Sequence, residues 1–407
     1  MKNSIPALCL ALLLGSCCGE KKADIVRQNF DSAAPQLRLA IRTADSITAA
    51  RPDSLVTAQG DYPRVFPRSI RKDGSLFLIP SKDWTSGFFP GSLWYMYEYT
   101  GDTLWKKQAE RFTDLLQREQ FNRNTHDIGF IINDSYGNGY RLTGNPAYKN
   151  VIVQAARTLS TRFNPNVGCI LSWNPRKGWQ FPVIIDNMMN LELLMNATRI
   201  TGDSTFYRIA VSHADTTMKN HYRPDYSSYH VIDYDSLSGK VLHRNTHQGY
   251  ADASSWARGQ AWGLYGYTAM YRETGDPRYL EQAEKIAGRI YTFPNMPEDM
   301  IPYWDFDAPD IPDAPRDVSA ATIMASALYE LSTLATEQGP RYKAWADRII
   351  DNLSASYLAP QGSNHGFLLL HSVGNLPGGS EIDTPLNYAD YYFLEALLRK
   401  RKCEIND

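Results

Sequence analysis

The stretch Ile200-Thr201-Gly202-Asp203, followed by a helical pattern from Phe206 to Met218, decides the fold of this 407-residue chain. Gly is preferred where a helix ends in a left-handed conformation, and Asp is preferred as the cap that starts the next helix. The stretch therefore joins two helices. Further copies precede helical patterns at 104–116, 148–161, 279–291 and 342–357; they are Tyr99-Thr100-Gly101-Asp102, Leu142-Thr143-Gly144-Asn145-Pro146, Glu273-Thr274-Gly275-Asp276-Pro277 and a weaker Glu337-Gln338-Gly339-Pro340.

A second, more apolar helix precedes each of these turns. Its residues are mostly Gly, Ala, Tyr and Leu, as expected of a helix surrounded on all sides, whereas the helices after the turns carry charge on one face. The apolar helices are expected at about 87–99, 130–142, 186–200, 256–273, 319–336 and 386–400, and an amphipathic segment at 33–50 opens the series. Six such pairs predict an all-α fold, an (α/α)6 barrel with an inner ring inside an outer ring. An open α-solenoid is the alternative.

The connections into the apolar helices are long and polar, while the connections out of them are the tight Gly-containing turns. The long connections are expected at 51–85, 119–129, 162–185, 219–255, 292–318 and 358–385. Because the inner helices of such a ring start at a common end, the long loops should gather there. Binding and catalytic residues are usually found on loops of this kind, so we expect a cleft at that end.

The first residues have the features of a bacterial export signal. Met1-Lys2 is a short basic start, Ile5 to Leu14 is an apolar run too short to span a bilayer, and Leu14-Gly15-Ser16-Cys17 resembles a lipobox. We expect a signal peptide at 1–17, lipidation of Cys17, a linker at 18–30 and a single catalytic domain at 31–407. The protein would then be a periplasmic or outer-membrane-anchored lipoprotein, and the lipid would be its only membrane attachment. An ordinary secretory signal is the alternative.

Composition excludes several classes of function. The net charge is −2 and no long run of Lys and Arg occurs, so a nucleic-acid partner is not expected. Cys18, Cys169 and Cys403 are scattered, and the Asp-rich stretch 299–317 lacks the spacing of a calcium loop, so no metal site is expected. No phosphate-binding or dinucleotide-binding motif is present. The sequence leaves the oligomeric state open.

Two acids lie where long loops meet inner helices. Asp127 is in Asn124-Thr125-His126-Asp127-Ile128-Gly129-Phe130, and Asp186 follows Phe181-Pro182-Val183-Ile184-Ile185 and precedes Asn187-Met188-Met189. Apolar neighbours should desolvate Asp186 and favour its protonated form, while a helix start favours the anion. A nearby Asp127 carboxylate would again favour the proton. The alternative is that both acids are simple helix caps.

Trp256-Ala257-Arg258-Gly259-Gln260-Ala261-Trp262 forms a third candidate site at another inner-helix start. The Arg258 guanidinium offers a planar fork for a carboxylate, and the two indoles offer flat faces for sugar rings. This combination favours binding of an acidic sugar. A packed Trp pair with a structural Arg is the alternative.

Two segments, Ile185-Asp186-Asn187-Met188-Met189-Asn190 and the Trp256–Trp262 stretch, resemble the unsaturated glucuronyl hydrolases of glycoside hydrolase family 88. The resemblance runs from Asp83-Trp84-Thr85-Ser86-Gly87-Phe88 to Asn387-Tyr388-Ala389-Asp390-Tyr391-Tyr392. A sibling family that acts on unsaturated rhamnogalacturonides shares the fold and the acid, but the Trp256–Trp262 stretch is more similar to family 88.

The resemblance implies a hydrolase that removes the 4,5-unsaturated uronic acid left at the non-reducing end of oligosaccharides by polysaccharide lyases. It implies that an Asp protonates C4 of the vinyl ether, that water adds at C5, and that rearrangement of the resulting hemiketal breaks the glycosidic bond. Asp186 matches the general acid and base, and Asp127 matches a second essential Asp. The matching substrate-binding residues are His230, Gln248 and Arg258 as polar groups, and Trp84, Trp256, Trp262 and, in a variable loop, Trp173 as stacking groups. No cofactor is implied.

Two other functions remain open at this point. In an ordinary glycosidase, Asp127 and Asp186 would act as the two carboxylates of a displacement or inversion reaction. A non-enzymatic glycan-binding lipoprotein would need the Trp residues but not a desolvated acid. The parent polysaccharide of the substrate, and whether sulfate is tolerated, depend on loops such as 358–385 and are not fixed by these motifs.

Overall fold

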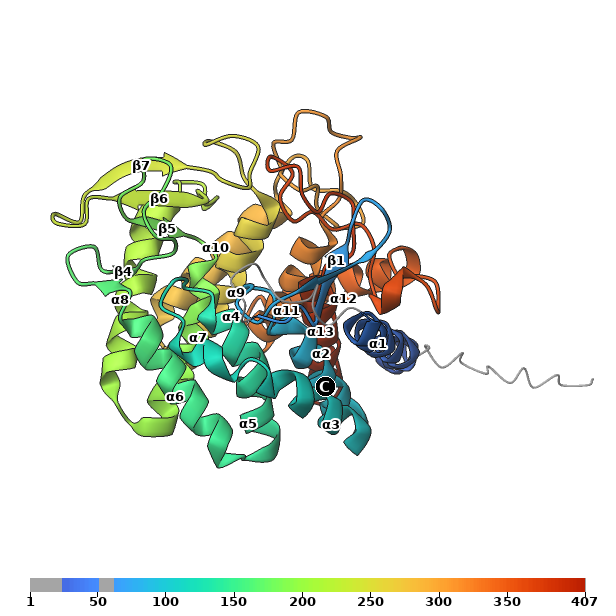
Figure 1. The fold of residues 1–407 in the computed structure, drawn as a ribbon. Coiled ribbons are helices and arrows are strands. Elements are labelled where there is room, and N and C mark those ends of the chain that lie inside the picture. The colour runs from blue at the N-terminus through green and yellow to red at the C-terminus, as the bar shows by residue number, and fades with distance from the viewer. Residues whose placement is uncertain (1–23, 51–61, 407) are drawn as a thin grey trace, which may run out of the picture.

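The computed structural model describes residues 24–50 and 62–406 (Figure 1). The predicted signal peptide and Cys17 therefore lie outside the described residues. Helix α1 begins at Ile25. The predicted linker at 18–30 was thus too long, because residues 25–30 already belong to the first helix. Within this helix Val26, Phe30, Ala33 and Leu37 are buried, a helical spacing that extends the amphipathic face predicted from residue 33.

The helices form two concentric sets. The outer helices are α1 (Ile25–Ala50), α3 (Thr103–Asp114), α6 (Pro146–Ser160), α8 (Ser204–His221), α10 (Pro277–Tyr291) and α12 (Gly339–Ser356). The inner helices are α2 (Phe88–Thr100), α7 (Asn187–Thr201), α9 (Ala257–Thr274), α11 (Val318–Leu334), α13 (Asn387–Asn406) and an interrupted helix made of α4 (Ile128–Ile132), the π-helical turn η3 (Asn133–Gly137) and α5 (Asn138–Thr143). Contacts run around the inner set from α2 to α13, α11, α9, α7, α4 and, through η3, back to α2. The predicted (α/α)6 barrel is confirmed.

The tight turns have the predicted chemistry. Gly202 ends α7 with φ +74°, and the Asp203 side chain accepts a hydrogen bond from the Thr205 amide at the start of α8. Gly101, Gly144 and Gly275 end their helices in the same left-handed conformation. The weaker fifth copy differs, because Gly339 is the first residue of α12 and Gln338 makes no capping bond.

The long loops carry short strands that the all-α prediction did not include. They are β1 (Phe66–Ile70) with β2 (Leu76–Ile79), β3 (Phe163–Asn164) with β4 (Cys169–Ile170), and the antiparallel sheet of β5 (Pro182–Ile184), β6 (Val231–Tyr234) and β7 (Val241–Asn245). Two 3₁₀ turns, η2 (Gln117–Phe121) and η4 (Asn364–Gly366), complete the elements. Figure 1 shows the β5–β7 sheet and the β1 strand at the upper end of the ring, where the long loops gather.

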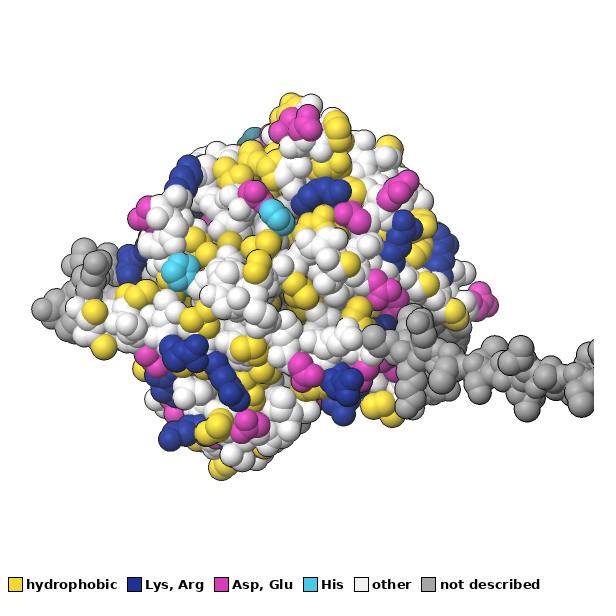
Figure 2. All heavy atoms as spheres, turned by 90° about the vertical axis from the view of Figure 1, so that its right-hand side faces the viewer, with side chains coloured by type: hydrophobic (Ala, Val, Ile, Leu, Met, Phe, Trp, Pro, Cys, Tyr) yellow, Lys and Arg dark blue, Asp and Glu magenta, His cyan; other side chains and the backbone are white. Residues whose placement is uncertain are grey.

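The inner ring is the main hydrophobic core. Trp94 of α2, Trp262 and Tyr267 of α9, and Tyr329 of α11 are all fully buried. Figure 2 shows positive and negative side chains interspersed over one outer face, in agreement with a net charge of −2. Among the described residues no helix is both long and apolar enough to cross a membrane.

Candidate active site

Asp186 lies where strand β5 turns into inner helix α7. The Ile185 amide donates to the His230 carbonyl at 3.0 Å, so the strand pairing continues up to the acid. This pairing brings the side chains together, with 3.7 Å between Asp186 Oδ2 and His230 Nε2. Asp186 occupies the N-cap position of α7, but its side chain makes no capping bond. The carboxyl is therefore not used as a cap.

Burial decides the protonation of this carboxyl. Asp186 is 7% exposed, and desolvation raises its pKa from 3.8 to about 7. The positive charge of Arg258 and the indole of Trp262 oppose the shift, while the negative charge of Asp127 adds to it. Desolvation is the main cause and Asp127 a lesser one. At mildly acidic pH the side chain therefore holds a proton that it can give to a bound molecule.

His230 is held as a neutral donor beside this acid. Its Nδ1 accepts the backbone amides of His247 at 3.1 Å and Gln248 at 3.2 Å, which places the ring proton on Nε2. Burial keeps the His230 pKa well below 6.5, so the ring is neutral. The Nε2–H group that faces Asp186 can therefore donate a hydrogen bond without carrying charge.

Asp127 lies at the start of α4 and, like Asp186, does not cap its helix. The Thr125 hydroxyl donates to its Oδ2 at 2.7 Å, and His126 Nε2 lies 3.2 Å from its Oδ1. The buried His126 ring is in turn 3.3 Å from the Asn190 amide, which belongs to the helix that Asp186 begins. The two acids are thus held by adjacent inner helices. The roles of His126, Thr125 and Asn190 were not predicted, since a buried polar residue gives no signal in a single sequence.

Arg258 does not present the open fork that was predicted from the sequence. Its side chain is fully buried; Nη1 donates to Asp317 at 2.9 Å and to the Val373 carbonyl, and Nη2 donates to the Gly374 carbonyl at 2.6 Å. Both terminal nitrogens are therefore used within the protein, because the loop after α12 folds over the start of α9. The guanidinium also lies 4.4 Å from the centre of the Trp256 ring. What remains for the site is its Nε group and its charge.

The predicted stacking residues divide into two groups. Trp256 packs on His230 with ring centres 4.5 Å apart, and Trp173 makes an edge-to-face contact with that histidine, with ring centres 6.1 Å apart. Trp262 and the half-buried Trp84 instead contact Phe130, at 5.2 and 5.6 Å. Trp256 and Trp262 are almost fully buried, so they line the floor of the site and do not offer an open face.

Gln248 connects His230 to the loop after α12, which also covers Arg258. Its backbone amide binds His230, and its side-chain Nε2 donates to the Gly374 carbonyl at 3.0 Å. The structure thus brings Gln248 beside His230, as expected for a residue of the same site.

Four buried polar atoms converge without a partner. Among the described residues, Asp186 Oδ2, His230 Nε2, Trp262 Nε1 and Arg258 Nε make no hydrogen bond of normal geometry. Buried polar groups are nearly always satisfied, so several unsatisfied atoms around one carboxyl indicate a place where a polar ligand binds. The protonated Asp186 can donate its proton, and the other three atoms are N–H groups that can donate hydrogen bonds. Together with the surrounding indoles, these donors suit a sugar, whose oxygens accept hydrogen bonds.

The Asp-rich stretch is used in loop structure. Asp305 accepts from the Tyr250 amide and the Ser254 hydroxyl, and Asp299 pairs with Arg316 at 3.0 Å. Asp317 caps α11 and holds Arg258. Within the described ranges, no three His, Cys, Asp or Glu side chains are grouped as metal ligands.

A cavity of about 790 Å³ lies away from these residues, among the C-terminal halves of the inner helices. Tyr95, Glu192, Tyr265, Arg272, Glu330 and Arg399 are among the residues that line it. None of the predicted site residues does so. Its charged groups already pair with one another, for example Arg272 with Glu330 and Arg399 with Glu330. Its size alone does not make it the active site.

Comparison with known proteins identifies the family. Residues 71–305 match the model of Glycosyl Hydrolase Family 88. The chain belongs to glycoside hydrolase family 88. It is 50% identical over 340 residues to an unsaturated glucuronyl hydrolase of Formosa agariphila, covering 83% of this chain and 84% of that protein.

Solved structures of unsaturated glucuronyl hydrolases agree with this assignment. The fold matches a crystal structure described as an unsaturated glucuronyl hydrolase specific for heparin, with TM-score 0.87, 49% identity, and coverage of 94% of this chain and 98% of that one. It also matches a variant of the Streptococcus agalactiae enzyme complexed with dGlcA-GalNAc6S, with TM-score 0.73, 28% identity, and coverage of 92% and 90%. The predicted enzyme class, a glycoside hydrolase, is confirmed, and the non-enzymatic glycan-binding alternative finds no support.

Proposed function

We propose that this family 88 hydrolase removes the 4,5-unsaturated uronic acid from the non-reducing end of lyase-generated oligosaccharides by hydrating the C4=C5 bond. The observation that carries the proposal is the buried Asp186 carboxyl, whose Oδ2 has no hydrogen-bond partner of normal geometry and whose pKa of about 7 keeps it protonated in mildly acidic solution. A vinyl ether is basic at C4, so one well-placed acid is enough to begin the reaction and no separate nucleophile is needed.

The reaction balances with water as the only co-substrate. Asp186 transfers its proton to C4, and the resulting cation at C5 is stabilised by the ring oxygen. Water adds to C5 and returns a proton to the Asp186 carboxylate, which restores the acid. The C5 hemiketal then opens to a ketone, and the hemiacetal left at C1 expels the remaining oligosaccharide. The anomeric carbon is not attacked by the enzyme.

The neighbours of Asp186 act on this proton transfer. Neutral His230, with its proton on Nε2, donates a hydrogen bond toward the reacting sugar and adds no charge that would compete for the proton. Arg258 supplies a buried positive charge that stabilises Asp186 once it becomes an anion. Asp127 has the opposite effect and favours the return of the proton. Together these groups set the acid strength of one carboxyl.

The test compares an unsaturated disaccharide made by a lyase with its saturated counterpart. The conjugated double bond absorbs ultraviolet light, and hydration removes that absorbance. We expect loss of absorbance together with release of the reducing sugar from the unsaturated compound, and no release from the saturated one. Cleavage of saturated glycosides would instead support an ordinary glycosidase that uses Asp127 and Asp186 as a carboxylate pair.

We also propose that the enzyme is exported and anchored through Cys17, on the basis of the sequence Leu14-Gly15-Ser16-Cys17. Cys17→Ala should abolish lipid labelling and release the protein from the membrane fraction, or block its processing. Cys18→Ala is the matched control and should leave labelling intact. Unchanged fractionation and labelling of the Cys17→Ala protein would contradict the anchor.

A further inference from the structure

A group of basic and aromatic side chains lies beside the site and is not used by the reaction described above. It consists of Arg176, Lys177, His247, Trp173 and Trp179, and we call it the basic rim. The Arg176 guanidinium lies 4.2 Å from the centre of the Trp173 ring, and Lys177 Nζ is 3.1 Å from His247 Nδ1. Trp173 and Trp179 are stacked, with ring centres 5.8 Å apart.

A tight turn presents the two cations. The Trp179 amide donates to the Arg176 carbonyl at 2.9 Å, and the two residues between them both have positive φ, +54° for Lys177 and +81° for Gly178. A left-handed conformation is unfavourable for lysine. Both cations are exposed at the tip of this turn, while the indoles beneath them are half-buried.

The positive charge of the rim is not neutralised within the described part of the chain. Neither Arg176 nor Lys177 has a carboxylate within ion-pair distance there, in contrast to Arg141, Arg199 and Arg289. The pKa of His247 is lowered to about 4. Desolvation is the main cause, and the positive charges of Lys177 and Arg176 add to it. A site with two unpaired cations beside a neutral imidazole is suited to an anion.

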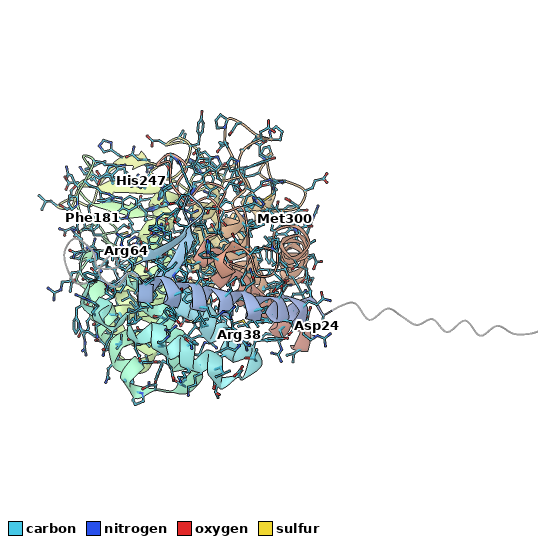
Figure 3. All side chains as sticks on the ribbon, turned by 45° about the vertical axis from the view of Figure 1, so that its right-hand side comes forward. Asp24, Arg38, Arg64, Phe181, His247 and Met300 are labelled. Carbon is cyan, nitrogen blue, oxygen red and sulfur yellow. The ribbon has the colours of Figure 1, made fainter. Side chains whose placement is uncertain are left out.

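The basic rim is connected to the reacting centre by direct contacts. Trp173 lies 6.1 Å from His230, whose Nε2 faces Asp186, and 5.2 Å from His247. The Trp173 backbone also pairs with Thr125, which binds Asp127. Two ring side chains, His230 and Trp173, separate Arg176 from Asp186. The cations therefore lie too far from Asp186 to take part in the protonation of C4. Figure 3 places His247 at the loop end of the molecule, on the same side as Phe181.

We propose that the basic rim binds an anionic group, a sulfate ester or a carboxylate, on the part of the substrate beyond the unsaturated sugar. The rim would then select anionic oligosaccharides. The two indoles would stack on the sugar ring, and Arg176 and Lys177 would bind its anionic group. This inference rests on the proposed function and adds a specificity determinant to it.

The test measures kcat/KM for three lyase-made substrates: an unsulfated disaccharide, the same disaccharide with a sulfate on its second sugar, and an unsulfated tetrasaccharide with a further carboxylate. Lys177→Gln keeps the chain length and removes the charge, and Arg176→Gln is added to make the double variant. We expect the double variant to lose on the order of tenfold or more for the anionic substrate that the rim recognises, as for a lost charged hydrogen bond, and to keep activity on the unsulfated disaccharide. Arg244→Gln is the matched control, because this exposed arginine of β7 lies 5.7 Å from the Tyr229 ring and contacts neither indole.

Each outcome decides one question. Selective loss on the sulfated disaccharide identifies a sulfate on the adjoining sugar, and selective loss on the tetrasaccharide identifies the carboxylate. Equal kcat/KM in variant and wild type on all three, or an equal loss on all three, overturns the proposal. If the wild type hydrates none of the substrates, the proposed function itself has failed and the rim is not the cause.

Discussion

At the scale of single residues, the site depends on what surrounds one carboxyl. Asp186 and Asp203 both occupy the N-cap position of a helix in the same barrel. The exposed Asp203 side chain accepts a hydrogen bond from the Thr205 amide, whereas the buried Asp186 side chain makes no capping hydrogen bond. The first is structural and the second is available for chemistry. The run of Ile and Met around Asp186 predicted desolvation of this acid, but the sequence left open whether it also caps its helix.

Replacing Asp186 tests its part in catalysis. Asp186→Asn keeps the shape of the side chain but cannot deliver a proton, so kcat should fall by at least about 10²-fold while substrate still binds. Asp203→Asn is the control, because Asn caps a helix as well as Asp does and Asp203 lies at a turn on the opposite end of α7. Steady-state kinetics and thermal unfolding of both variants measure the effect. A kcat within a few-fold of wild type for Asp186→Asn would remove this residue from the reaction.

The pH dependence of the rate follows from the same carboxyl. The protonated form is the active acid, so kcat should decline as pH rises through about 7, where Asp186 loses its proton. The negative charge of Asp127 raises the pKa of Asp186, so Asp127→Asn should move this decline to lower pH in addition to reducing the rate. Profiles of kcat against pH for the two proteins give the shift directly. A decline that stays in place, or moves to higher pH, would show that the two carboxyls do not interact as described.

At the scale of elements, the two acids are placed by the close approach of α4 and α7. A Cβ on Gly129 would lie 2.6 Å from the Asn190 backbone Cα, so only glycine allows this packing. The Asn190 side chain also accepts the Phe130 amide at 3.0 Å, which fixes the two helices in register. Asp127 and Asp186 are the residues that precede these helices.

Forcing these helices apart should therefore damage activity as well as stability. Gly129→Ala should destabilise the protein by about 1–3 kcal/mol, as overpacking of a core does, and should lower kcat because Asp127 moves relative to Asp186. Gly288→Ala on α10 is the matched control, since no atom lies within 4 Å of its added Cβ. Chemical denaturation and steady-state kinetics measure both effects. If Gly129→Ala loses neither stability nor rate, the helix contact does not position the acids.

At the scale of the whole molecule, the barrel was predictable and much of the site was not. The turns at Gly101, Gly202 and Gly275 have a local cause, so the sequence alone predicts where helices end and restart. The short strands in the loops have no such local signal. The partners of Arg258 lie 59 to 116 residues away, at Asp317, Val373 and Gly374, and only the folded chain shows that they occupy its terminal nitrogens.

Protonation of C4 by the enzyme is the central step of the proposed reaction, and the most direct measurement of that step uses labelled water. A lyase-made disaccharide is turned over in deuterated, heavy-oxygen water and the released uronic acid is analysed at once. We expect one deuterium at C4, added to a single face of the sugar from the first turnover, with loss of the ultraviolet absorbance. Release of an intact unsaturated sugar with no deuterium at C4 and with heavy oxygen on the anomeric carbon would contradict the proposed reaction.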